Sequence, residues 1–159
     1  MRFVVYHSAY EIQTTERAYD LSRTATGVNS LIKAMDDHGI PPNGNVWCEL
    51  GTTWRETMRD PTQAAHVIGK LLSRMGEDRV LWGTDGIWLG RRRRRSRRSG
   101  RLEITEAFQQ TYGYPALTPE RKAKVFGRNA ASLFGVDIDA VTCGIDADLL
   151  AASKASSRC

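Results

Sequence analysis

The chain has 159 residues, of which 41% are hydrophobic and 26% charged, and its formal net charge is +5. This length suits one ordinary domain, and the apolar content is typical of globular proteins. The chain has three cysteines without metal-binding spacing, which excludes a disulfide scaffold. It has no signal peptide and no membrane-spanning run, which excludes an integral membrane protein. These observations together predict a reducing cytoplasm.

The chain begins with a predicted strand and a predicted helix. Residues 3–6 form an apolar run that ends at His7, which is typical of a short strand. A polar loop over residues 14–17 follows. Residues 28–35 then place apolar side chains at helical spacing, and Gly39 ends the predicted helix.

The middle of the chain repeats this alternation. We expect a strand over residues 46–50 that closes in a turn at residues 51–53. A helix over residues 61–75 is well marked, because Asp60 can cap it and apolar side chains form one stripe along it. Residues 79–82 predict the third strand.

A tight turn ends this third strand and carries Asp85 at its tip. After it we expect helices over residues 102–108 and 118–134, and a short helix over residues 147–155 in an Ala- and Ser-rich tail. The carboxyl ends of strands in a parallel α/β barrel are where chemistry is done, so Asp85 is a candidate metal ligand or general base.

Short apolar strands alternating with helices predict an α/β fold with parallel pairing and right-handed crossovers. Three strands make an incomplete parallel sheet with flanking helices, because such sheets normally have more strands and both faces covered. We therefore interpret residues 1–136 as the last portion of a larger α/β domain and residues 137–159 as a C-terminal tail.

Other residues that could carry chemistry are predicted to play structural parts. Cys48 lies within a strand pattern and is expected to be a buried apolar side chain. His38 precedes the glycine that ends a helix, and His66 lies beside polar side chains on its helix, so both are expected at the surface. Four residues are expected to pack in the core and at its rim: Trp47, Trp54, Trp82 and Trp88.

Four segments, in order, resemble the C-terminal part of the amidohydrolase-related family. Residues 4–8, Val-Val-Tyr-His-Ser, look like the sixth strand of its barrel, and residues 46–50 stand where the seventh belongs. Residues 79–85 look like the eighth strand with its aspartate. Residues 124–135, in which Asn-Ala precedes Leu-Phe-Gly, are similar to the closing helix. The family comprises metal-dependent (β/α)₈-barrel hydrolases and decarboxylases.

The resemblance implies a metal-dependent enzyme that hydrolyses or decarboxylates a small organic substrate. The family's eighth-strand aspartate maps to Asp85, which would bind the metal or accept a proton from water. Its sixth-strand histidine maps to His7, as a metal ligand or as a group that orients water or substrate. A divalent ion, Zn²⁺ by preference, would be the cofactor. Glu49 and Trp88 would line the pocket.

The family's first-strand His-x-His pair and its fourth- or fifth-strand ligands have no counterpart in this sequence. His7 and Asp85 then remain as the groups expected to contact the metal. A catalytic zinc usually has three protein ligands, so we expect this chain to bind metal poorly alone. A separate N-terminal half or a second copy of the chain is the expected partner, and a membrane is not.

Seven arginines between Arg91 and Arg98 account for the positive charge, since the chain without residues 91–100 carries −2. One interpretation is a nucleic-acid or anion-binding fragment, although no aromatic residue lies within the run and no known nucleic-acid fold surrounds it. A solvated loop is the plainer alternative. A third is a pair of compensating frame changes, because codons for this run, shifted by two bases, encode Ser-Pro-Pro-Pro-Gln-Ile-Glu-Ala-Phe, which resembles the family's sequence there. We favour the frame changes.

Overall fold

The computed structural model describes residues 1–23, 26–85 and 102–143. Trp88, the arginine run and the expected helix over residues 147–155 lie outside these described residues. Within them, none of the helices combines the length and the apolar character needed to span a membrane.

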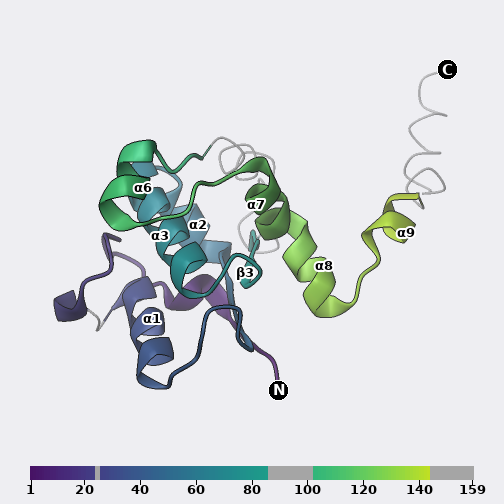
Figure 1. Ribbon diagram of the computed structural model, residues 1–159, viewed down its shortest axis with the longest axis horizontal. Coiled ribbons are helices and arrows are strands. Elements are labelled where there is room, and N and C mark those ends of the chain that lie inside the picture. The colour runs from purple at the N-terminus through teal and green to yellow at the C-terminus, as the bar shows by residue number, and fades with distance from the viewer. Residues whose placement is uncertain (24–25, 86–101, 144–159) are drawn as a thin grey trace.

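The centre of the fold is a parallel sheet of three strands in the order β1-β2-β3, as the alternating pattern predicts (Figure 1). The strands are β1 (Phe3–Val5), β2 (Val46–Glu49) and β3 (Val80–Leu81). Val5 pairs with Cys48, and Glu49 pairs with Leu81. The strands therefore end close together along one edge, and the described residues close no barrel.

Two helices cover one face of this sheet, α1 (Gly27–Asp37) and α3 (Pro61–Arg74). Their apolar stripes pack on side chains of β2 and β3 in the main hydrophobic cluster. Asp60 caps α3 by accepting hydrogen bonds from the N–H groups of Thr62 and Gln63. Cys48 is fully buried in this cluster, as expected, and burial raises the pKa of its thiol to about 12.

The other face of the sheet carries Trp47 and Leu81, which pack against Leu133 of α8 (Asn129–Phe134). Figure 1 shows α7 (Pro119–Ala123) and α8 on the opposite side of β3 from α1 and α3. The last described helix, α9 (Ile138–Cys143), projects away from the body.

The long helix expected over residues 118–134 is interrupted by a π-helical turn, η3 (Lys124–Arg128). Val125 in this turn accepts a hydrogen bond from the N–H of Trp82, over 3.0 Å. Asn129 donates through its side-chain amide to the carbonyl of Val80. The C-terminal helix thus bonds to backbone groups of β3 and the residue that follows it, which explains the irregular turn.

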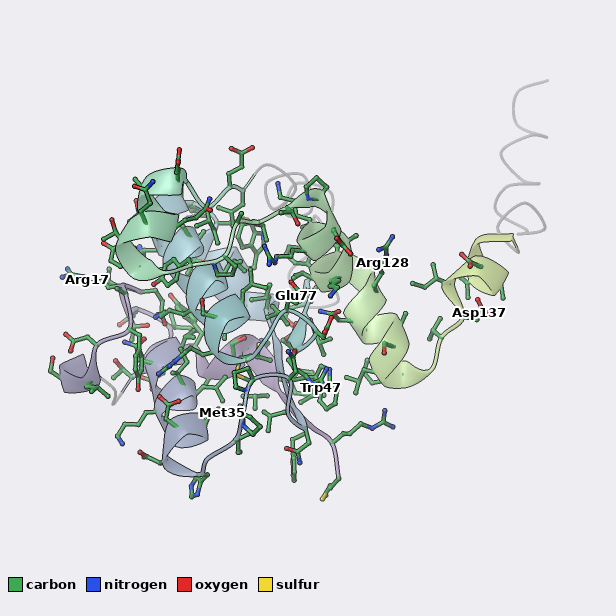
Figure 2. The ribbon with its side chains drawn as sticks, in the orientation of Figure 1. Arg17, Met35, Trp47, Glu77, Arg128 and Asp137 are labelled. Carbon is green, nitrogen blue, oxygen red and sulfur yellow. The ribbon has the colours of Figure 1, made fainter. Side chains whose placement is uncertain are left out.

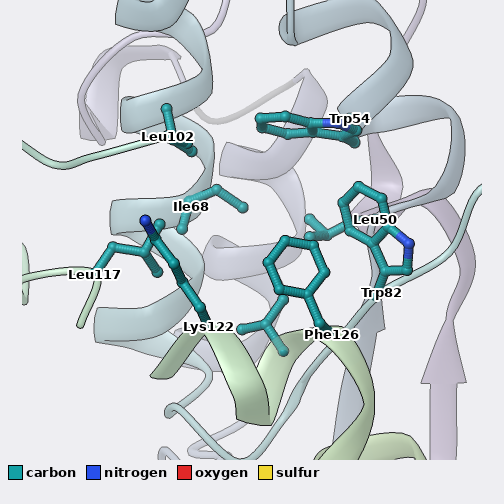
Figure 3. A pocket seen from close by; sticks show the side chains of 9 residues that line it. Leu50, Trp54, Ile68, Trp82, Leu102, Leu117, Lys122 and Phe126 are labelled. Carbon is teal, nitrogen blue, oxygen red and sulfur yellow. The ribbon is translucent and has the colours of Figure 1, made fainter. Parts of the chain in front are cut away.

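Figure 3 shows how this helix also closes the apolar core. Trp54 and Trp82 lie with ring centroids 5.9 Å apart, and Phe126 packs edge-on against Trp82 at 4.9 Å. These rings line an apolar cavity of about 20 Å³. The expectation that Trp47, Trp54 and Trp82 pack in the core and at its rim is confirmed.

Two expected elements differ in the structure. Residues 102–104 are not helical, although Leu102 and Ile104 are buried, and the helix α6 begins only at Glu106 and runs to Tyr112. The turn expected at residues 51–53 is instead the start of a short helix, α2 (Gly51–Thr57). Smaller turns complete the described elements: η1 (Tyr6–Ala9) and η2 (Leu21–Arg23).

The expected surface position of His66 is wrong. His66 is only 6% exposed, and its Nδ1 lies 3.1 Å from the hydroxyl oxygen of Tyr114. Rings of Phe108 and Tyr112 flank it, each with a centroid 4.9 Å away. Burial, with the nearby Lys70 charge, lowers the pKa of His66. His38, by contrast, is exposed at the end of α1, as expected.

A buried ion pair also lies beneath the loop expected to be polar. The ammonium of Lys70 donates to Glu16 Oε2 over 2.5 Å and to Asn29 Oδ1 over 2.7 Å. The two charged side chains are 1% and 3% exposed. Glu16 Oε1 accepts a hydrogen bond from the N–H of Val28, so this carboxylate also pairs with one of the backbone N–H groups that have no partner within the first turn of α1. The loop and two helices are joined by this one carboxylate.

The loop before β3 is tied to the C-terminal helix by Glu77, which is labelled in Figure 2. Its carboxylate accepts from Arg121 Nε over 2.7 Å and from Lys124 Nζ over 2.5 Å. These two cations hold the pKa of Glu77 below its usual 4.5. The ion pairs are therefore formed above pH 4.5 and are lost as the pH falls through the lowered pKa.

We expect Glu77→Gln to remove part of the acid sensitivity of the fold. The free energy of unfolding, measured by urea titration at a series of pH values, should fall less steeply below pH 4.5 in the variant than in the wild type. Parallel curves for the two proteins would show that this carboxylate does not titrate with folding.

Candidate metal centre

Three side chains with metal-binding atoms meet at the carboxyl edge of the sheet. His7 follows β1, Glu49 ends β2 and Asp85 follows β3. Each offers one nitrogen or oxygen atom, and these three atoms all lie within 4.8 Å of one another. The sheet therefore gathers one donor from the end of each of its strands.

His7 Nδ1 faces both carboxylates. It lies 3.4 Å from Glu49 Oε2 and 3.6 Å from Asp85 Oδ2. The side chains of Glu49 and Asp85 are 11% and 21% exposed, whereas that of His7 is 40% exposed. Two partly desolvated carboxylates beside an imidazole nitrogen form a site that favours a cation.

The backbone around His7 is unusual. His7, Ser8 and Ala9 have φ angles of 56°, 49° and 57°, in the left-handed region that non-glycine residues seldom adopt. Hydrogen bonds hold this turn: the N–H of His7 donates to Glu49 Oε2, and the hydroxyl of Thr53 donates to the carbonyl of His7. The turn directs the imidazole back over the end of the sheet.

Both carboxylate oxygens of Glu49 accept hydrogen bonds from backbone N–H groups, which fix the side chain in place. Oε1 accepts the N–H of Gly51 over 2.7 Å, and Oε2 accepts the N–H of His7 over 3.1 Å. Gly83 makes room for this carboxylate, because a Cβ at that position would lie 1.3 Å from Oε1. A glycine is therefore required opposite Glu49.

Asp85 also has a left-handed backbone, with φ 45°. Its Oδ2 accepts a hydrogen bond from the hydroxyl of Thr52 over 2.5 Å. The N–H of Thr52 donates to His7 Nδ1 over 3.3 Å. Thr52 at the start of α2 thus touches two of the three donor groups.

The three metal-binding atoms are close enough together to share one metal ion, since all lie within 4.8 Å of one another. A Cβ placed on Gly51 would lie 2.7 Å from His7 Nδ1, 2.8 Å from Glu49 Oε1 and 2.9 Å from Asp85 Oδ2. A side chain at position 51 would therefore crowd all three residues, and we call the space between their metal-binding atoms the hollow above Gly51. One imidazole nitrogen with two carboxylates is a donor set that suits Zn²⁺ and related divalent ions.

The structure brings together both residues that the sequence singles out, His7 and Asp85. It adds Glu49 as a third possible ligand, where sequence reasoning had placed it only in the pocket wall. The signal was a charged residue inside the apolar run of β2, where all four residues are buried. His66 lies on α3 among aromatic rings and takes no part in the cluster.

A family model described as Amidohydrolase matches residues 27–136. The chain belongs to the amidohydrolase family. The match covers Glu49, Asp85 and the C-terminal helix with Asn129, whereas His7 lies before it. A search of curated proteins and a search of solved structures each return no match. Membership of this family supports a hydrolase or a related activity in general terms.

Proposed function

We propose that His7, Glu49 and Asp85 are metal ligands in a centre that hydrolyses, or decarboxylates, a small organic substrate. The observation that carries this proposal is the meeting of one imidazole and two carboxylates beside Gly51, with one metal-binding atom from each within 4.8 Å of the others. Zn²⁺ is the preferred ion, since catalytic zinc sites commonly have three nitrogen or oxygen ligands and one open position.

A divalent ion bound there would supply Lewis-acid chemistry, acidifying a water molecule and polarising a substrate carbonyl. The residues of the chain do the rest. Asp85 accepts the proton of the attacking water, and the Thr52 hydroxyl holds its carboxylate in place. Glu49, buried and bonded to two backbone N–H groups, keeps its charge directed at the hollow.

Three ligands within one chain revise the expectation of poor metal binding, which counted only His7 and Asp85. Apolar side chains remain exposed at β1 and at the turn after it, since Phe3 of β1 is 47% and Tyr6 of η1 71% exposed. We propose that further strands of a barrel cover the sheet edge at β1, from an N-terminal half or from a second copy of the chain. Those strands would complete the substrate pocket.

The proposal is tested by loading the chain with Zn²⁺ and measuring ester and amide hydrolysis and CO₂ release from small carboxylic acids. Turnover should disappear on chelation. It should fall about 100-fold or more in Asp85→Asn, because general-base and ligand functions are both lost. Asp37→Asn is the matched control, because Asp37 is an exposed carboxylate that forms a surface ion pair with Lys33.

Equal turnover in Asp85→Asn and the wild type would remove Asp85 from the mechanism. Wild-type protein without any metal-dependent turnover would contradict the proposed function itself.

A further inference from the structure

Thr52 occupies a special place in the candidate centre. The first turn of α2 contacts every donor residue: Gly51 bonds to Glu49, Thr52 to His7 and Asp85, and Thr53 to His7. Thr52 differs from its neighbours because it donates two hydrogen bonds, one to the side chain of His7 and one to the side chain of Asp85. We propose that Thr52 is the positioning residue that prepares His7 and Asp85 to bind a metal ion, an inference that rests on the proposed function.

The first step concerns the imidazole of His7. A ring nitrogen accepts a hydrogen bond only when it carries no proton, so the Thr52 N–H selects the tautomer in which Nδ1 is unprotonated. The same Nδ1 faces Glu49 and Asp85 at 3.4 and 3.6 Å. The Thr52 N–H thereby holds the ring in the metal-free chain with Nδ1 toward the two carboxylates, and a bound ion would take the place of this hydrogen bond.

The second step concerns the carboxylate of Asp85. This side chain is carried on a left-handed backbone in a loop after β3, where local structure gives it little support. The hydroxyl of Thr52 donates to Oδ2, the oxygen that faces His7. Hydrogen bonds from neighbouring groups commonly orient metal ligands and raise metal affinity about 10- to 100-fold.

The chain offers a close set of variants for this role. Thr52→Val keeps the N–H and the shape of the side chain but removes the hydroxyl, whereas Thr52→Ser keeps both donors. Thr57→Val is the matched control, because Thr57 lies in the same helix and its hydroxyl donates to the carbonyl of Thr53 rather than to a proposed ligand. The readout is Co²⁺ binding to the full chain, followed by its visible absorption, with thermal unfolding of the metal-free proteins alongside.

We expect Thr52→Val to weaken Co²⁺ binding at least about 10-fold and to change the intensity of the absorption bands. Thr52→Ser and Thr57→Val should bind within about twofold of the wild type. The unfolding temperature of Thr52→Val should change no more than that of Thr57→Val.

Wild-type Co²⁺ affinity and spectrum in Thr52→Val would overturn the positioning role while leaving the metal site intact. The same follows if Thr52→Ser is as impaired as Thr52→Val, since the hydroxyl would then not be the cause. Wild-type protein that binds no Co²⁺ would contradict the metal site and the role of Thr52 together.

Discussion

Replacing Gly51 by alanine is expected to abolish metal binding while leaving all three proposed ligands in the chain. The added methyl group would lie 2.7–2.9 Å from His7 Nδ1, Glu49 Oε1 and Asp85 Oδ2, close enough to push these three atoms out of the arrangement that would hold the cation. Gly51 starts α2 without a left-handed φ, so alanine is compatible with its backbone. We expect Co²⁺ affinity, measured by absorption titration, to fall about 100-fold or more.

Gly127→Ala is the control for this experiment. Gly127 lies in the C-terminal helix, and a Cβ there meets nothing within 4 Å. This variant should bind Co²⁺ as the wild type does. Circular dichroism should show that Gly51→Ala remains folded, since crowding of this kind costs about 1–3 kcal/mol. Folded Gly51→Ala that binds Co²⁺ with wild-type affinity would show that the ion does not occupy this hollow.

The second large effect is expected on stability, from Lys70→Met. Lys70 is 1% exposed and neutralises Glu16, which is 3% exposed. Methionine fills a similar volume but leaves the carboxylate of Glu16 buried without its counterion. Breaking a buried ion pair by removing one partner costs about 3–5 kcal/mol, a large share of the total stability of a domain. Urea unfolding at pH 7 measures the loss.

Lys33→Met provides the comparison on a surface pair. Lys33 and Asp37 form an i, i+4 ion pair on α1, with side chains 43% and 54% exposed. Such exposed pairs are screened by solvent and contribute little to stability, so this variant should unfold near the wild-type urea concentration. If Lys70→Met were no less stable than Lys33→Met, the buried pair would not be a determinant of the fold.

The sheet and the pairing of His7 with Asp85 could be predicted from the sequence. Short apolar runs that alternate with amphipathic helices predict parallel strands, and parallel strands bring their carboxyl ends to one edge. The resemblance to the family assigns His7 and Asp85, which follow the first and third runs, to one site, and the structure places His7 Nδ1 3.6 Å from Asp85 Oδ2. Glu49 was harder to assign, because a glutamate at the end of a strand can point to solvent as readily as to a site.

The environment of Glu16, His66 and Lys70 could not be predicted in the same way. Helical periodicity assigned the apolar stripe of α3 to the core and left its polar stripe at the surface. In the structure, the loop that carries Glu16 and the segment that carries Tyr114 cover that polar stripe. Burial of a polar face depends on such distant segments, which no local pattern reveals.

The sequence predicts a turn at residues 51–53, and it does not reveal that these residues begin the helix α2 and contact the proposed ligands, for a related reason. Gly51, Thr52 and Thr53 have the composition of a turn, and their helical state depends on hydrogen bonds to His7 and Glu49. Tertiary contacts here decide the local structure. The same contacts are those that arrange the proposed ligands.

The central claim, that the three strand ends form a metal site, is tested most directly by anomalous X-ray diffraction from crystals soaked in Zn²⁺. The account predicts one anomalous peak in the hollow above Gly51, within about 2.0–2.2 Å of His7 Nδ1 and of an oxygen of each carboxylate. A map in which this hollow carries no peak would contradict the account.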